Sequence, residues 1–354
     1  MANSISKSIH ELILRGVAIP AHPLAVDNNR KLDERRQRAL SRYYLDAGVG
    51  GLAVGVHTTQ FEIRDPEIGL YEPVLSLVQE ELDAFAVRSE RPIARIAGVV
   101  GKTNQAVTEA ELAASLGYDA VLLSLTSLPD ASNKELIDHC NAVAGVIPIF
   151  GFYIQAVVGG RDLDVDFWRE FSQIENVVAI KTAPFNRYKT LDVVRGVVES
   201  GRAEEVALYT GNDDNILIDL LGEYRIEKDG GYISKRIDGG LLGHWAVWAK
   251  RAVELVEKVQ AGEFESATTD ALALANKITD CNAAFFDAAN NFSGCIVGLH
   301  EVLRRQGLLE GVWTLNEAES LLPRQKAEID RVYNAYPELN DDTFVEENIN
   351  RWMN

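Results

Sequence analysis

The sequence contains few cysteines, and their placement excludes the small disulfide-rich and zinc-knuckle classes. Three of its 354 residues are cysteine: Cys140, Cys281 and Cys295. Their number is odd and no two lie close together, so neither a disulfide framework nor a paired metal-ligand motif is expected. With 47% hydrophobic and 25% charged residues, the composition is that of an ordinary packed globular protein.

Long apolar runs and basic clusters are also missing. No apolar stretch approaches the roughly 18 residues of a membrane helix, and residues 1–11 lack the basic-then-apolar pattern of a signal peptide. A cytoplasmic protein without membrane association is therefore expected. The net charge is −18, and the basic residues around positions 30–36 alternate with acidic ones. Nucleic acid is accordingly not an expected partner.

Short apolar runs alternate with amphipathic stretches through the first two thirds of the chain. The runs are apolar on both faces, as in a parallel sheet covered by helices. Strands are predicted at Gly16–Ile19, Gly51–Val54, Ile93–Ala97, Ala120–Ser124, Ile147–Tyr153, Val177–Lys181, Val206–Tyr209 and Gly240–Leu242. Helices are predicted at Asp33–Asp46, Val74–Ser89, Gln105–Leu116, Lys134–Ala144, Asp164–Ser172, Tyr188–Ser200 and Asp213–Leu221. Eight such units favour a (β/α)8 TIM barrel, and the main alternative is a doubly wound open sheet, although no GxGxxG opens its first crossover.

The strand signals stop near residue 250. We expect residues 1–250 to form the barrel and residues 251–354 to form a C-terminal helical extension packed on it. Its helices are predicted at Phe264–Asp280, Cys281–Asn290, Ser293–Gln306 and Pro323–Ala335. The polar, turn-rich stretch 222–231 lies between the seventh and eighth units and predicts an inserted loop or short hairpin.

One lysine ends an apolar run, where a charge is costly. Lys181 is the last residue of the predicted sixth strand. Burial disfavours the ammonium form, lowers the pKa and leaves a free amine that can condense with a carbonyl as a Schiff base. Tyr153 ends the fifth strand and is a candidate proton relay beside that amine. A lysine that reaches solvent and a core tyrosine are the structural alternatives for each residue alone.

Other polar residues follow predicted strands, where the functional groups of a TIM barrel gather. The hydroxyls of Thr58 and Thr59, after the second strand, are candidates for holding a carboxylate. Three histidines, His22, His57 and His244, follow strands one, two and eight, which are neighbours in a closed barrel. They are expected to converge and to supply acid and base groups, with isolated structural roles as the alternative. A three-histidine metal site is a further alternative. No metal or cofactor is expected, because an imine-forming lysine makes a metal electrophile unnecessary.

Four landmarks in order give the chain a resemblance to the dihydrodipicolinate synthase / N-acetylneuraminate lyase family of Schiff-base aldolases. They are His57-Thr58-Thr59-Gln60-Phe61, Gly98-Val99-Val100-Gly101, Tyr153, and Ala179-Ile180-Lys181, with an echo of a further motif in Gly211-Asn212-Asp213-Asp214. The resemblance implies a lyase with Lys181 and Tyr153 as catalytic residues, Thr58 and Thr59 on the substrate carboxylate, and a homo-oligomer, dimer or tetramer. Asp213 or Asp214 is expected to meet substrate hydroxyls, and the other to cap a helix.

The chain also departs from the family pattern. Gln60-Phe61 stands in place of Gly-Glu, Ile154-Gln155-Ala156 follows the tyrosine, and the strand-four tyrosine of the synthases is missing. Lysine biosynthesis is therefore not the expected role. We expect an aldolase or lyase acting on a pyruvate-type 2-oxo acid or a sugar-acid derivative. A dehydratase or decarboxylase using the same imine, or a barrel that binds keto acids or sugar acids without turnover, are the alternatives.

Overall fold

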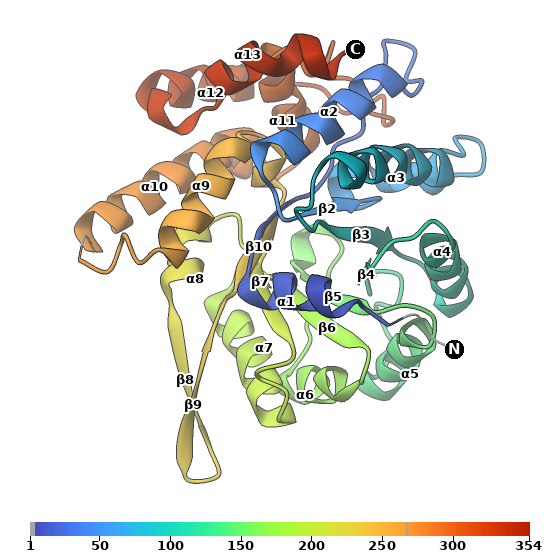
Figure 1. Ribbon diagram of the computed structural model, residues 1–354, viewed down its shortest axis with the longest axis vertical. Coiled ribbons are helices and arrows are strands. Elements are labelled where there is room, and N and C mark those ends of the chain that lie inside the picture. The colour runs from blue at the N-terminus through green and yellow to red at the C-terminus, as the bar shows by residue number, and fades with distance from the viewer. Residues whose placement is uncertain (1–3, 267) are drawn as a thin grey trace.

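A computed structural model describes residues 4–266 and 268–354 and contains the predicted barrel (Figure 1). The barrel strands are β1 (Ala18–Pro20), β2 (Gly51–Val54), β3 (Ala94–Val99), β4 (Ala120–Leu123), β5 (Ile149–Ile154), β6 (Val177–Ala183), β7 (Ala207–Thr210) and β10 (Gly239–Leu242). All of them pair in parallel, in the order β1-β10-β7-β6-β5-β4-β3-β2. A bridge between Ala21 and Ala53, with the N–H of His22 donating to the Ala53 carbonyl at 2.8 Å, joins β1 to β2. The (β/α)8 prediction is confirmed.

The helices that surround the barrel follow the strands in the expected alternation. They are α2 (Glu34–Ala47), α3 (Tyr71–Arg88), α4 (Thr103–Ser115), α5 (Asn133–Ala144), α6 (Val165–Gln173), α7 (Arg187–Ser200), α8 (Ile216–Leu221) and α9 (Ala249–Gln260). Several begin at side chains that accept from the first free N–H groups, as Asp33, Ser132, Asp164 and Asn186 do.

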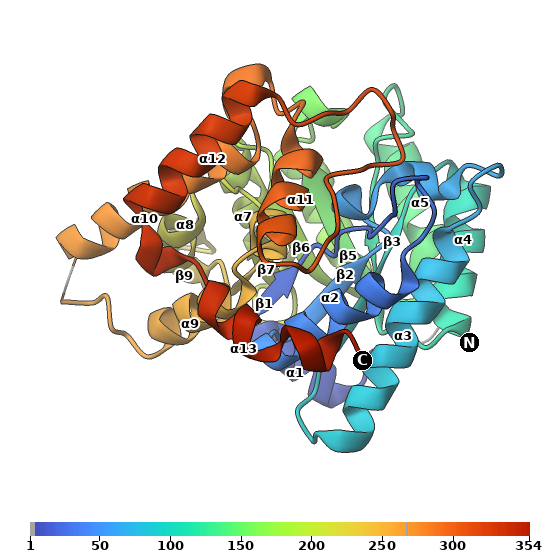
Figure 2. The same ribbon diagram turned by 90° about the horizontal axis from the view of Figure 1, so that it is seen from above.

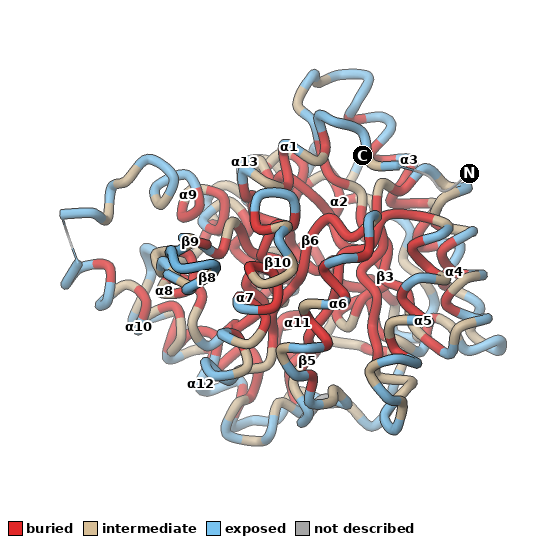
Figure 3. The backbone as a smooth tube through the Cα atoms, turned by 90° about the horizontal axis from the view of Figure 1, so that it is seen from below, coloured by how far each residue is buried: buried red, intermediate tan, exposed pale blue. Residues whose placement is uncertain are grey.

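Strand side chains alternate between two apolar layers. Inward residues such as Ile19, Ile96, Phe150 and Leu241 fill the barrel, while outward residues pack beneath the helices. A helix absent from the predictions, α1 (Lys7–Arg15), closes the amino-terminal end, where the Tyr209 hydroxyl donates to the Ile13 carbonyl at 2.9 Å. The opposite, carboxyl-terminal end of the barrel is therefore the one left for a site. Figure 3 shows the buried strands inside an exposed outer surface.

The 222–231 stretch is a hairpin, the second of the two forms expected for it. Strands β8 (Glu223–Lys228) and β9 (Gly231–Arg236) pair antiparallel and project from the barrel below α8, beside α7 (Figure 1).

The C-terminal extension differs from the prediction in its boundaries. It contains α10 (Thr268–Phe285), α11 (Cys295–Arg305), α12 (Pro323–Ala335) and α13 (Asp342–Trp352). Helix α10 runs unbroken through the predicted boundary at residue 280, and α13 was not predicted. Figure 2 shows these helices gathered on one side and over one end of the barrel. Tyr43 of α2 anchors the last of them, donating to Asp341 at 2.7 Å and packing on Trp352 with ring centroids 5.4 Å apart.

No described helix is both long and apolar enough to span a membrane.

Candidate active site

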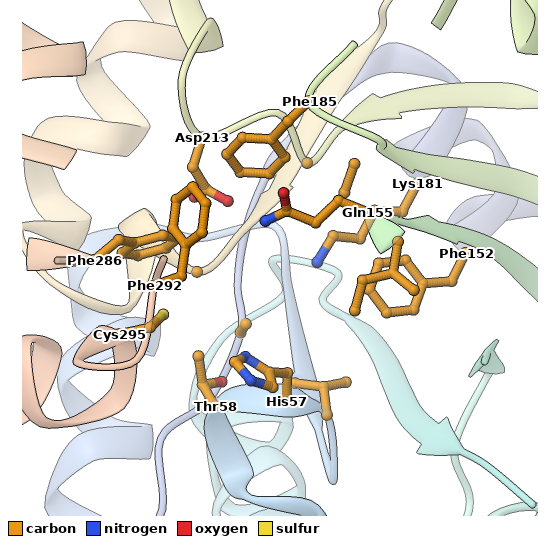
Figure 4. Close-up of a pocket in the computed structure, with 16 residues that line it drawn as sticks. His57, Thr58, Phe152, Gln155, Lys181, Phe185, Asp213, Phe286, Phe292 and Cys295 are labelled. Atoms are coloured by element: carbon orange, nitrogen blue, oxygen red, sulfur yellow. The ribbon is translucent and has the colours of Figure 1, made fainter. Parts of the chain in front are cut away.

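A cavity opens at the carboxyl ends of the barrel strands. Its polar lining comes from three loops and one strand, namely His57, Thr58, Gln155, Lys181 and Asp213. The rest of the lining is small or apolar: Ala21, Val56, Phe152, Ile154, Ala183, Phe185, Gly211, Gly243, Phe286, Phe292 and Cys295. Figure 4 shows the Lys181 amine pointing into this space, with His57 and Thr58 on one side and Asp213 on another.

Lys181 extends inward from β6 and is 8% exposed. Its Nζ lies 4.5 Å from the centroid of the Phe152 ring, and it forms no ion pair with any described residue. Burial lowers the pKa of Lys181 to about 8, although the nearby Asp213 charge acts to raise it. The site therefore holds an amine whose neutral form is accessible near physiological pH.

A glycine makes room for the lysine chain. A Cβ on Gly211, at the end of β7, would lie 2.5 Å from Cε of Lys181 and 2.9 Å from Cβ of Ala183. These distances are shorter than van der Waals contact, so only glycine leaves the lysine its present path.

The turn after β2 places His57 and Thr58 in the cavity. Thr59 holds this turn from below: its Oγ1 accepts from the N–H of Gly55 at 2.9 Å and donates to the His22 carbonyl at 2.7 Å. Its hydroxyl is committed to the loop and does not line the cavity, contrary to the expectation that both threonines would face a ligand. In the part of the chain that the structure describes, the Thr58 hydroxyl makes a single long hydrogen bond, donating to the same carbonyl at 3.3 Å.

His57 is the one histidine of the predicted trio that lines the cavity. Burial, with a smaller contribution from the Lys181 charge, lowers its pKa to about 4. Its ring has no hydrogen-bond partner within residues 4–266 and 268–354, so a neutral imidazole with both nitrogens available faces the amine (Figure 4). Such a ring can accept or return a proton during a reaction.

The other two histidines point away, and the predicted convergence is wrong. The His22 ring lies under α2, bonded to the Ser41 hydroxyl at 2.9 Å and to the Pro23 carbonyl at 2.8 Å. The His244 ring packs among residues of α9 and α10, 5.6 Å from the Phe285 ring and with Nδ1 3.3 Å from the Asn282 amide. No cluster of metal-ligating side chains occurs in the described residues.

Tyr153 also lies outside the cavity, which corrects the expectation that it sits beside the amine. The β5–β6 register shifts between Ile149 and Phe150, so Phe152 pairs with Lys181 and Tyr153 pairs with Thr182. Phe152 consequently faces inward. Tyr153 faces the helices, where its hydroxyl accepts from the Leu163 N–H at 3.2 Å and its ring lies 5.2 Å from that of Trp168.

Asp213 follows β7 and is not the helix cap, since α8 begins after Asn215. Its Oδ1 accepts from the backbone N–H of His244 at 2.8 Å. Burial raises the pKa of Asp213 to about 7, against the lowering effects of that bond and of Lys181. A carboxyl group poised between its two forms thus stands across the cavity from the amine. Asp214 is half-exposed and lies 3.7 Å from Arg187.

Comparison with known proteins identifies the family of the chain. A model of the dihydrodipicolinate synthetase family matches residues 16–314. The chain belongs to this family. The match includes Lys181, the Thr58 loop and Asp213, and it extends through α11, so the family prediction is confirmed.

Individual relatives are distant from this family member. N-acetylneuraminate lyase from Citrobacter koseri is 26% identical over 257 residues, which is 72% of this chain and 77% of the lyase. A 4-hydroxy-tetrahydrodipicolinate synthase from Acaryochloris marina is 28% identical over 141 residues, 38% of this chain and about half, 46%, of the synthase.

Solved structures share the fold at lower identity. Dihydrodipicolinate synthase from Oceanobacillus iheyensis superimposes with a TM-score of 0.74 at 17% identity, covering 93% of this chain and 99% of that one. N-acetylneuraminate lyase from Fusobacterium nucleatum gives 0.69 at 16% identity, covering 91% and 99%.

Sequence reasoning missed the residues that the extension contributes. Phe286, Phe292 and Cys295 come from the end of α10, the following turn and the start of α11, more than a hundred positions after Lys181. Gln155 and Phe185 were missed as well, although each follows a strand that carries a predicted site residue, which was the available signal.

Proposed function

We propose that this chain is a lyase of the class I aldolase type, acting on a 2-oxo acid through an imine at Lys181. The observation that carries the proposal is the Lys181 amine: it is buried in the cavity, forms no ion pair with a described residue and has a pKa lowered to about 8. A structural lysine would instead be paired or would extend to solvent. The proposal leaves open dehydration or decarboxylation of a keto sugar acid, since both use the same imine.

The loop after β2 would hold the substrate carboxylate. The Thr58 hydroxyl is weakly committed, and the first N–H groups of the His57–Thr59 turn are those that a 3₁₀ helix leaves without an internal acceptor. A carboxylate bound there places the adjacent carbonyl carbon toward the amine, because the loop and Lys181 line the same cavity. Thr59 would act indirectly, by fixing the loop.

The reaction begins when the neutral Lys181 amine adds to the 2-oxo carbonyl. Loss of water from the carbinolamine gives the imine, which withdraws electrons from the neighbouring carbon. Cleavage then breaks the C3–C4 bond of a 4-hydroxy-2-oxo acid: the 4-hydroxyl loses its proton, the aldehyde leaves, and the electron pair remains as an enamine. Protonation at C3 and addition of water release pyruvate and the free amine.

Two side chains in the cavity are candidates to carry these protons. His57 faces the amine as a neutral imidazole, and Asp213 lies on the side where the departing aldehyde would sit. We assign proton transfer at the carbinolamine to His57 and contact with the 4-hydroxyl to Asp213. Tyr153, given the catalytic role from sequence, is reassigned to positioning of the strand-five loop through Leu163.

The barrel predicted at 1–250, which α9 (Ala249–Gln260) completes, and the C-terminal helices that follow would act as one unit. The barrel supplies the reacting groups, and the extension supplies three cavity-lining side chains. We also retain the expectation of a homo-oligomer, a dimer or a tetramer, in a cytoplasmic setting. Family membership supports the homo-oligomer, and one structural relative is described as a monomeric dihydrodipicolinate synthase variant.

Turnover tests the proposal against binding without chemistry. Purified protein is incubated with a panel of 2-oxo-3-deoxy acids, and released pyruvate is measured at steady state. The proposal predicts release from at least one member by the wild-type protein and none by Lys181→Ala. Tight binding of these acids with no release from any of them would favour a non-catalytic keto-acid or sugar-acid binding barrel.

A further inference from the structure

The extension forms an aromatic roof over the cavity. Phe286 and Phe292 belong to this extension, and Phe185, from the loop after β6, lies beside Phe292 (Figure 4). The Phe185 and Phe292 rings contact edge to face, with centroids 5.7 Å apart and planes inclined at 69°. This contact joins a barrel loop to the extension directly across the space above Lys181.

Both residues of that contact have an unusual backbone conformation. Phe185 has φ of 52° and Phe292 has φ of 64°, in the left-handed region that bulky residues rarely adopt. Such conformations persist only where the surroundings impose them, and they gather at ligand-binding sites.

Specific bonds impose these conformations. The Phe185 N–H donates to Oδ1 of the buried Asn212 at 3.0 Å. On the other side, the carbonyl of Asp287 accepts from the Phe292 N–H at 3.2 Å, and its carboxylate accepts from Arg324 at 2.7 Å. The aromatic roof is thus anchored from both the barrel and α12.

The aromatic roof differs in polarity from the part of the cavity around Lys181, His57 and Thr58. Beyond the imine-forming centre, the lining consists of Phe185, Phe286, Phe292 and the Cys295 thiol, whose pKa burial raises. Among the described residues that line this side, only Gln155 and Asp213 offer side-chain oxygen or nitrogen atoms (Figure 4). A polyhydroxylated chain placed here would leave most of its hydroxyls without partners, which is costly. An aromatic substrate ring would instead pack edge-to-face or face-to-face against the phenylalanine rings, and an oxygen atom of the substrate would lie within reach of Asp213.

We propose that the aromatic roof makes this enzyme selective for an aromatic aldehyde as the second component of its aldol reaction. The inference rests on the function proposed above. In the synthetic direction, the pyruvate enamine at Lys181 attacks the aldehyde carbon with its C3, forming one C–C bond. The aldehyde oxygen takes a proton, and addition of water to the imine releases a 4-aryl-4-hydroxy-2-oxo acid and the free amine. No oxidant, reductant or further reactant is required.

The test compares two aldehydes under the same conditions. The full-length protein is given pyruvate with either benzaldehyde or glyceraldehyde, and kcat/KM for the aldehyde is obtained from product formation. We expect kcat/KM to favour benzaldehyde by at least about tenfold, since hydrophobic pockets discriminate by about 10- to 200-fold per group. Equal use of the two, preference for glyceraldehyde, or acceptance of neither aldehyde overturns the inference.

Variants of the aromatic roof test whether it causes the preference for benzaldehyde. Phe292→Ala and, separately, Phe185→Ala should each lower kcat/KM for benzaldehyde at least about tenfold, with a much smaller effect on glyceraldehyde. Tyr232→Ala, which removes an aromatic ring exposed on the distant hairpin, is the matched control and should change neither value. Two roof variants guard against one that fails to fold, and unchanged selectivity in a folded variant contradicts the assignment.

Borohydride trapping with pyruvate alone tests imine formation separately from the preference for an aromatic aldehyde. Trapping depends on Lys181 and not on the aldehyde, so the folded roof variants should still be trapped. Normal trapping without aromatic preference refutes this inference and leaves the proposed function standing. Absence of trapping in the wild-type protein refutes the proposed function itself.

Discussion

Lys181 lies across the face of Phe152, its Nζ 4.5 Å from the ring centroid. The two residues are register partners on β6 and β5, so both side chains project to the inside of the barrel. The ring shields the lysine chain from water on one side while leaving the amine open to the cavity. This arrangement favours a lysine that is buried but still able to meet a ligand.

The pKa of Lys181, near 8, predicts the pH dependence of imine formation. Because the neutral amine is the nucleophile, the initial rate with pyruvate should rise as pH increases and level off above about pH 8. The negative charge of Asp213 raises the lysine pKa, so Asp213→Asn should move the midpoint to lower pH. Rapid-quench trapping across pH 6 to about 10 measures both profiles; a midpoint that stays fixed in Asp213→Asn would contradict the assigned coupling.

Gly211→Ala should disturb the reactive lysine. The new Cβ would lie 2.5 Å from Cε of Lys181, so the lysine chain must leave its present path. We expect the rate of trapping with pyruvate to fall at least about tenfold, because small displacements of a reacting group cost large factors. Gly231→Ala is the control, since its nearest neighbour would be the Lys228 carbonyl oxygen at 3.8 Å. Equal trapping rates in the two variants would show that the lysine accommodates the methyl group.

The barrel could be predicted because each of its strands is buried on both faces and therefore reads as a short apolar run. Elements that depend on tertiary contacts were harder to predict. Helix α1 is short and is stabilised by closing the barrel floor through Ile13, and α13 packs through Trp352 against Tyr43 of α2. Neither contact can be recognised from the local sequence of the helix, because each depends on residues far away in the chain.

Within the site, Lys181 could be predicted because a charge that follows a short apolar run is conspicuous, although β6 continues to Ala183. The orientation of Tyr153 could not, because it depends on the register shift at Ile149/Phe150, and a shift of one residue reverses which side chain faces inward. The predicted convergence of the three histidines was wrong for a related reason: a position just after a strand does not determine the direction of the side chain. The roof residue Phe292 reaches the cavity only through the path of the whole extension.

Tyr153→Phe provides a test of that reorientation. Removal of the hydroxyl leaves the buried Leu163 N–H without its acceptor, which should lower the free energy of unfolding by about 1–3 kcal/mol. Turnover should stay close to wild type, because the hydroxyl does not reach the cavity. Denaturant unfolding and steady-state kinetics measure the two effects. A loss of kcat of about a hundredfold or more would instead place the hydroxyl in the reaction.

His57→Gln should slow turnover without destroying the imine-forming centre. If the neutral imidazole transfers protons, kcat falls by about 10²–10⁴-fold, while reductive trapping with pyruvate still reaches completion given time. His10→Gln is a suitable control, because that ring lies on α1 at the opposite end of the barrel, 2.9 Å from the Glu205 carbonyl. Wild-type kcat in His57→Gln would assign proton transfer to another group.

The central claim is that Lys181 forms the imine, and reductive trapping measures it most directly. The protein is incubated with pyruvate and borohydride, and intact mass is followed by peptide mapping. We expect one reduced pyruvyl group per chain, located on the peptide that contains Lys181. No adduct is expected in Lys181→Ala, or in Lys181→Arg, since the guanidinium group stays protonated. An adduct that persists in Lys181→Ala, or no adduct in the wild-type protein with any 2-oxo acid, would contradict it.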